Sequence, residues 1–146
     1  MAVKEDYTLE DVIEVVNLTN ATLGIELVGI RTNINILMNP ELTEELIENK
    51  DLLKVLIKVL DKAFNSYVMN ENLYNFILIG TYSNYSYFNE FKVTVEELIL
   101  NIHGLLAFEE LKGLPEAEEL EITAVNLENS IKKLAICYEI LNNKEV

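Results

Sequence analysis

A seven-residue repeat near the C-terminal end restricts the fold of this chain more than any other feature. Leucine recurs at every seventh position, at Leu120, Leu127, Leu134 and Leu141. The positions three residues before each leucine are also apolar, and they are Ala117, Ala124, Ile131 and Tyr138. This a/d pattern predicts one long helix over 117–141, with Pro115 in its first turn.

The surroundings of this repeat favour a helix packed in a bundle over an intermolecular zipper. A zipper that grips DNA carries a basic region upstream, whereas the stretch before this repeat is acidic, from Glu109 to Glu121. Four further apolar residues lie off the seam: Ile122, Val125, Ile136 and Ile140. We therefore expect this helix to be covered on more than one side.

The N-terminal region is also helical in period. Thr8 is a candidate N-cap, with Asp11 three residues later, and apolar residues then recur at spacings of three and four as far as Leu37. Gly24 and Gly29 leave two alternatives open. The segment is either broken there, or it forms one helix of about 30 residues with a stutter.

Three more helical segments are expected in the middle of the chain. A short acidic helix spans about 39–49, and a longer helix follows over about 51–69 with a ladder of lysines on one side, Lys50, Lys54, Lys58 and Lys62. The apolar stripe of the longer helix is read as Leu52, Leu53, Leu56, Ile57, Leu60, Phe64, Tyr67 and Val68. A capping box at Thr94 and Glu97 predicts another helix that runs to about Leu111.

The residues between these helices have a different composition. Residues 72–79 could continue the preceding helix. Over about 80–93 the chain is rich in Tyr, Ser and Asn, which predicts an irregular aromatic segment, a loop or at most a small hairpin. No internal repeat or low-complexity linker divides the chain. The sequence therefore predicts an all-α fold, a single domain over 1–146 built as a bundle of four to six helices.

Catalytic and cofactor motifs are missing from the sequence. His103 is the single histidine, read as a core or boundary residue, and Cys137 is the single cysteine, read as a small buried side chain. No Glu-x-x-His pair, calcium loop or glycine-rich phosphate loop is present. We therefore expect a protein that is not an enzyme and that uses no metal or other cofactor.

The charge balance limits the partners. A formal net charge of −14 excludes an ordinary nucleic-acid binder, which needs a basic face to displace counterions.

No signal peptide is visible, and no apolar run approaches the roughly 18–20 residues that span a bilayer. With one cysteine the chain forms no internal disulfide, which fits a reducing interior. We expect a cytoplasmic protein without a membrane partner.

These features favour a small acidic interaction protein that inhibits a basic, nucleic-acid-handling partner such as a polymerase, nuclease or defence effector. Its carboxylates would present a field like that of DNA or RNA. The abundance of Asn and Ile and the absence of Gln and Trp are typical of A+T-rich genomes, including those of phages and viruses, whose proteins act in the host cell. The expected contact residues are Glu41, Glu44, Glu48, Glu116, Glu119, Tyr82, Tyr85, Tyr87 and Phe88.

A second hypothesis is a homo-oligomeric structural or assembly protein. It would associate, as a homodimer or larger species, through the Leu120–Leu141 seam and the lysine ladder.

Overall fold

The protein is built from long α-helices. The computed structural model describes residues 8–39, 48–80 and 84–144. Among these residues it contains four α-helices: α1 (Leu9–Leu37), α3 (Lys50–Leu78), α4 (Tyr85–Leu106) and α5 (Pro115–Lys144). A single 3₁₀ turn, η1 (Glu109–Leu111), lies between α4 and α5, and no strand occurs in the described part of the chain. The all-α prediction is confirmed, and the number of helices falls within the predicted range.

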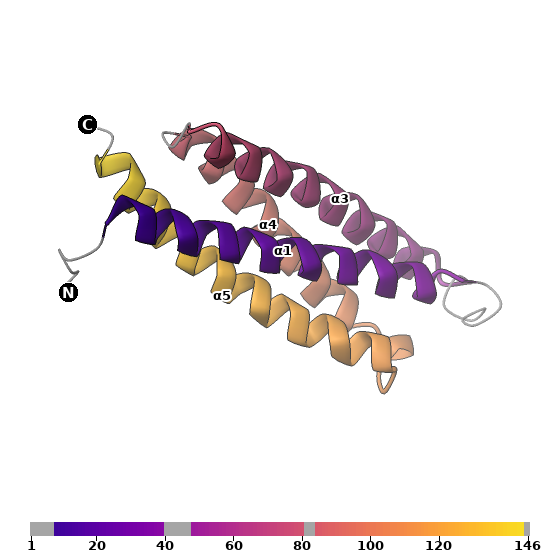
Figure 1. The fold of residues 1–146 in the computed structure, drawn as a ribbon. Helices are drawn as coiled ribbons and strands as arrows, with labels where there is room; N and C mark the ends of the chain where they lie inside the picture. Colours follow the sequence, from indigo (N-terminus) through magenta and orange to yellow (C-terminus); the bar gives the residue numbers. More distant parts are fainter. Residues whose placement is uncertain (1–7, 40–47, 81–83, 145–146) are drawn as a thin grey trace.

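The four helices form an antiparallel bundle in which neighbours in the chain are neighbours in space (Figure 1). Each helix packs against the helix before it and the helix after it, and α5 closes the bundle by returning to α1. A helix of 29 residues, such as α1, spans about 43 Å. The bundle therefore has two well-separated ends and four long lateral faces.

The α1 helix begins at the predicted N-cap, Thr8, which forms a capping box with Asp11. The Thr8 side chain accepts a hydrogen bond from the Asp11 backbone N–H at 3.0 Å, and the Thr8 backbone N–H donates to the Asp11 carboxylate at 3.2 Å. Neither Gly24 nor Gly29 interrupts the helix, which is continuous for 29 residues. The alternative of one long helix is therefore the correct one.

The boundaries of α3 and α4 differ from those expected. The α3 helix continues to Leu78, which agrees with the alternative that residues 72–79 prolong it. The α4 helix already begins at Tyr85, so residues 85–93 are helical rather than irregular. Thr94 lies inside α4, where its hydroxyl donates to the Glu90 carbonyl at 2.9 Å, so it is not a helix cap. Burial of Phe88 and Phe91 in the core outweighs the weak helix propensity of the neighbouring polar residues.

Two predicted segments lie partly or wholly outside the described residues. The acidic helix expected over 39–49 falls mostly within residues 40–47, and Tyr82 falls within residues 81–83.

Between α4 and α5 the chain turns at Gly113, whose positive φ of 85° is a conformation that glycine adopts without strain.

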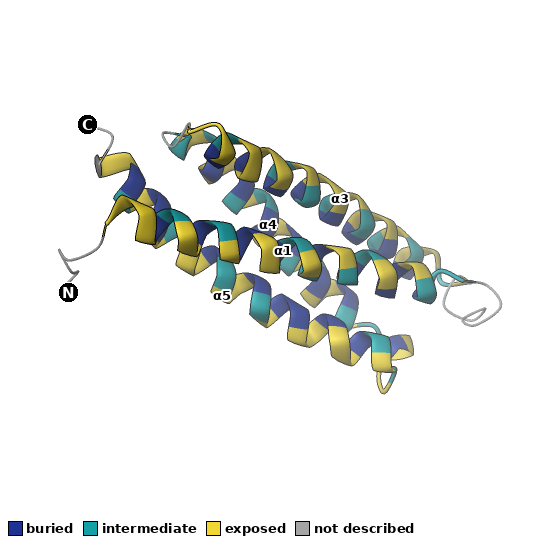
Figure 2. Ribbon diagram, in the orientation of Figure 1, coloured by how far each residue is buried: buried dark blue, intermediate teal, exposed yellow. Residues whose placement is uncertain are grey.

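The heptad seam of α5 faces the bundle core. All eight of its residues are buried: Ala117, Leu120, Ala124, Leu127, Ile131, Leu134, Tyr138 and Leu141. The apolar residues beside the seam are placed differently from the expectation, because Ile122, Val125 and Ile136 are exposed. Figure 2 shows both buried and exposed residues along α5. The α5 helix is therefore covered along its seam but not along the adjacent outward stripe.

The core stripe of α3 also differs from the predicted one. The helix buries a row that includes small and polar residues, namely Leu52, Leu56, Val59, Ala63, Ser66, Asn70, Leu73 and Ile77. In contrast, Ile57, Phe64 and Val68 are exposed. Small side chains let neighbouring helices approach closely, so they occupy the contact face even though larger apolar residues stand next to them.

The α1 helix is apolar on two sides. Its core side contributes Val16, Leu23 and Leu27, which are fully buried, while Leu18 and Ile25 on the outside are exposed. By length and composition α1 is long and apolar enough to cross a membrane, a test that the core helix of a soluble protein and a signal sequence also pass. Packing in the bundle accounts for the apolar core side of α1, but not for its apolar outer side.

Candidate functional site

The acidic residues predicted to contact a partner gather at one end of the bundle. Glu48 precedes α3, while Glu116 and Glu119 lie in the first turns of α5, and both helices begin at the same end (Figure 1). A hydrogen bond of 2.7 Å from the Asn49 Nδ2 atom to the Glu110 carboxylate ties the start of α3 to η1. Glu41 and Glu44 lie outside the described residues.

The predicted aromatic contacts lie at the other end, where α4 begins. Phe88 is buried and stacks on Tyr138, with ring centroids 4.5 Å apart. Tyr87 meets Phe76 edge to face and accepts a hydrogen bond from Asn72 at 2.9 Å. Tyr85 is half-buried. The 22 residues of α4 separate these rings from the acidic residues by about 33 Å, so the structure does not bring the two predicted groups together.

We use the term acidic end for the carboxylates of η1 and of the start of α5. They are Glu109, Glu110, Glu116, Glu118, Glu119 and Glu121. Lys112 is the single cation within residues 109–121, and its Nζ atom lies 3.8 Å from Glu109. The start of α3 adds Lys50 and Asp51 to the same end of the bundle. Acids in the first turn of a helix are stabilised by its dipole, which is a structural reason for part of this cluster.

Hydrogen bonds hold part of the acidic end in place. The Asn33 Nδ2 atom on α1 donates to the Glu119 carboxylate at 2.8 Å, and the bond from Asn49 lowers the pKa of the Glu110 carboxyl. A hollow of about 390 Å³ lies beside them, and its lining includes His103, Glu118 and Glu121. No cluster of His, Cys, Asp or Glu suited to a metal ion occurs among the described residues.

The two side chains considered for catalysis occupy different surroundings. His103 is exposed on α4 rather than in a core or boundary position. Cys137 is buried, and burial raises the pKa of its thiol, although Lys133 opposes that shift. A thiol with a raised pKa is protonated at neutral pH and is a poor nucleophile.

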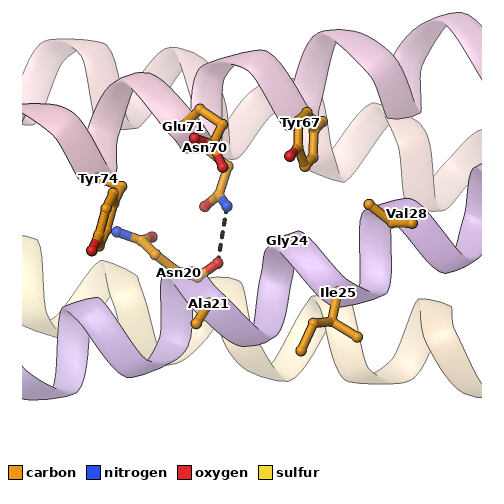
Figure 3. Close-up of a pocket in the computed structure, with 9 residues that line it drawn as sticks. All are labelled: Asn20, Ala21, Gly24, Ile25, Val28, Tyr67, Asn70, Glu71 and Tyr74. Carbon is orange, nitrogen blue, oxygen red and sulfur yellow. Dashed lines mark hydrogen bonds between the residues drawn. The ribbon is translucent and has the colours of Figure 1, made fainter.

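A groove between α1 and α3 is a second candidate site, and the sequence patterns did not point to it. It has a volume of about 480 Å³, within the range of ligand pockets. Figure 3 shows Asn70 reaching down from α3, between Tyr67 and Tyr74, toward Asn20 on α1. The remaining lining residues are Ala21, Gly24, Ile25, Val28 and Glu71.

The floor of this groove holds buried polar atoms that lack partners. The Asn70 Nδ2 atom donates to the Asn20 backbone carbonyl at 2.9 Å. Within the described residues, the Asn70 Oδ1 atom and both polar atoms of the Asn20 side chain have no hydrogen-bond partner. Asn20 is 2% exposed and Asn70 is 3% exposed. Each unsatisfied group of this kind costs about 1–3 kcal/mol.

The walls of the groove carry almost no charge. Glu71 is the single side chain in the lining that is charged at neutral pH. Between Glu14 and Arg31 the α1 helix has one charged residue, Glu26, and its carboxylate accepts a hydrogen bond from Asn126 on α5. Ile25 is 73% exposed beside the groove. In a chain with a net charge of −14, this face is apolar and nearly neutral.

A sequence signal for this site does exist, but it depends on knowing the contact stripes. Asn20 stands one turn from Val16 and Leu23, and Asn70 stands one turn from Leu73, so each asparagine interrupts a core row. An amide in a core row points to a buried polar contact. The apolar pattern of α3 indicates a different row, so it hides this signal.

Comparisons with protein-family models, with curated proteins and with solved structures gave no match.

Proposed function

We propose that the protein is a non-enzymatic interaction protein that binds and inhibits a basic, nucleic-acid-handling partner. The observation that carries this proposal is the acidic end, where carboxylates from η1 and α5 converge with Lys112 as the one cation in that stretch. Such a field attracts a basic groove and speeds its association.

The extent of the acidic end limits how long a stretch of nucleic acid the protein can imitate. Duplex DNA as long as α5, about 45 Å, carries about 26 phosphates along its whole length. The acidic end holds six closely spaced carboxylates, others such as Glu10 and Glu14 lie at the opposite end, and the middle of α1 is nearly uncharged. We therefore propose that the acidic end imitates a short stretch of nucleic-acid backbone, entering the partner's groove end-on.

Self-assembly through the heptad seam has less support. The seam leucines are fully buried inside the bundle, so a second copy could reach them only if the bundle opened. Within the lysine ladder, Lys62 is bonded to Glu97 of the same chain. Both surfaces that the assembly hypothesis requires are thus at least partly occupied within one molecule.

Competition with labelled duplex DNA tests the proposal. Purified polymerases and nucleases are mixed with fluorescent DNA, and the protein is titrated in at 50 mM and 300 mM salt. We expect DNA to be displaced from at least one of these enzymes at low salt, and displacement to weaken steeply at high salt. No displacement from any enzyme tested, or displacement that does not depend on salt, would contradict the proposal.

A matched pair of variants locates the contact. Glu118→Gln with Glu121→Gln removes two charges from the acidic end, whereas Glu10→Gln with Glu14→Gln removes two from the opposite end of the bundle. We expect the first pair to weaken displacement several-fold and the second to have little effect. Equal effects of the two pairs would mean that net charge, rather than the acidic end, governs binding.

A further inference from the structure

We infer that the groove between α1 and α3 binds a guanidinium group, namely an arginine side chain of the basic partner. This inference deepens the proposed function, because it specifies which group of the partner is held and where. It starts from the buried polar atoms of the groove floor, which neither the helices nor the acidic end accounts for.

Two hydrogen-bond acceptors without partners lie buried at the floor, where a ligand reaches them by displacing the side chains that cover them. Because the Asn70 Nδ2 atom is engaged by the Asn20 carbonyl, the Asn70 Oδ1 atom is left as an acceptor, and the Asn20 Oδ1 atom is a second one. The Glu71 carboxylate adds a negative charge to the lining. A guanidinium has five N–H donors in a plane and no acceptor, so it matches this set.

The aromatic side chains favour a cation. Tyr67 and Tyr74 stand two turns apart on α3 and flank Asn70 (Figure 3). A cation near the face of such a ring is attracted by its quadrupole. The protein already contains one example close by, since the Arg31 guanidinium lies 5.6 Å from the centroid of the Phe64 ring. Arg31 itself is outside the lining of the groove.

The apolar walls suit the stem of an arginine. Ile25 and Val28 provide exposed aliphatic surface beside the groove, against which the methylene groups can pack while the charged head reaches the floor. A net charge of −14 disfavours an anionic ligand. A neutral amide would pair with the asparagines but gain nothing from Glu71, and a lysine offers a point charge rather than a planar fork.

The test is an NMR titration of the full ¹⁵N-labelled chain with the peptide acetyl-Gly-Gly-Arg-Gly-Gly-amide. A second peptide with citrulline in place of arginine has nearly the same shape and no charge. We expect the arginine peptide to shift the side-chain amide signals of Asn20 and Asn70 and the backbone amide of Gly24, and to bind about tenfold more tightly than the citrulline peptide. Equal binding of both peptides, or no saturable shift at these three residues, would overturn the inference.

Exposed residues of the lining provide variants that preserve the core. We expect Tyr74→Leu and Glu71→Gln each to weaken binding of the arginine peptide about threefold to fivefold. Glu90→Gln, which removes the same charge from an exposed site on α4, is the matched control and should leave the affinity unchanged. Equal weakening by Glu71→Gln and Glu90→Gln would show general charge attraction and would also overturn the inference.

The same titration separates this inference from the proposed function. Glu118→Gln with Glu121→Gln should leave the peptide shifts at Gly24 intact. If the arginine peptide still binds the groove while no nucleic-acid-handling enzyme is inhibited, the proposed function fails and the groove assignment stands. If inhibition occurs but Tyr74→Leu changes neither inhibition nor peptide binding, the groove assignment fails and the proposed function stands.

Discussion

The acidic end and the α1/α3 groove use polar groups in opposite ways. At the acidic end, charged side chains stand in water, where ion pairs such as Lys112–Glu109 contribute little to stability. In the groove, the neutral amides of Asn20 and Asn70 are buried with atoms unpaired, which lowers the stability of the folded chain. A surface can therefore be rich in charge without affecting folding, while two buried amides reduce stability.

The two regions also differ in whether their polar groups need a functional explanation. Charged residues on a solvated surface have a general explanation in solubility and helix dipoles, so the acidic end needs a binding experiment to give it meaning. Buried atoms without partners have no such general explanation. The groove is therefore the place where a ligand would relieve a defect that the structure itself contains.

The largest effect is expected beneath both surfaces, in the seam of α5. Leu127→Asp places a carboxylate in the core and should destabilise the protein by more than about 4 kcal/mol, enough to unfold it. Ile122→Asp, at an exposed position on the same helix, should change stability by less than about 0.5 kcal/mol. Urea denaturation followed by circular dichroism measures both, and a folded Leu127→Asp protein would contradict the bundle described here.

The next largest effect is expected at the groove floor, where a substitution should stabilise the protein rather than destabilise it. Asn20→Leu removes two unpaired polar atoms and should stabilise the protein by about 1–2 kcal/mol. Asn65→Leu, at an exposed position of α3, is the control and should change stability by less than about 0.5 kcal/mol. If Asn20→Leu is destabilising in chemical denaturation, its amide has partners in solution and the contrast between the two regions disappears.

A smaller effect is expected where α3 meets the acidic end. Asn49 caps α3 by accepting hydrogen bonds from the backbone of Asp51 and Leu52, so Asn49→Ala should cost about 1 kcal/mol. Its amide also lowers the pKa of Glu110. A carboxyl group whose pKa is lowered by folding stabilises the folded protein at pH values above the pKa that it has in the unfolded chain. This contribution is lost as the pH falls through the pKa of the folded state.

Denaturation as a function of pH checks this part of the argument. The cost of Asn49→Ala should be larger at pH 7 than at a pH low enough to protonate Glu110. A cost that is the same at both values would leave the helix cap as its sole origin.

The smallest effect is expected at the acidic end itself. Glu118→Gln with Glu121→Gln should change the free energy of unfolding by no more than about 0.5 kcal/mol, because both side chains are exposed. The same pair of substitutions should weaken partner binding several-fold. A strongly destabilised variant would mean that these carboxylates serve the fold rather than a partner.

Parts of the fold with strong local signals were predictable. The N-cap at Thr8 is a pattern within one helix and is found at the predicted position, and the α5 residues that repeat every seven positions are buried. The start of α4 was missed, because Phe88 and Phe91 are held in the helix by core contacts that local composition does not report. Among the candidate site residues, the acids fall at one end of the bundle and the aromatics at the other, which no local pattern indicates.

The amino-acid sequence alone settles that this chain is helical, acidic and without a recognisable catalytic motif, because periodicity, charge and motif spacing are properties of neighbouring residues. Which stripe of α3 faces the core, and that two asparagines from distant segments meet beneath a groove, is settled only when the helices pack. Packing selects the face that allows the closest approach of whole helices, and on α3 that face carries Ala63, Ser66 and Asn70 rather than the larger apolar side chains beside them.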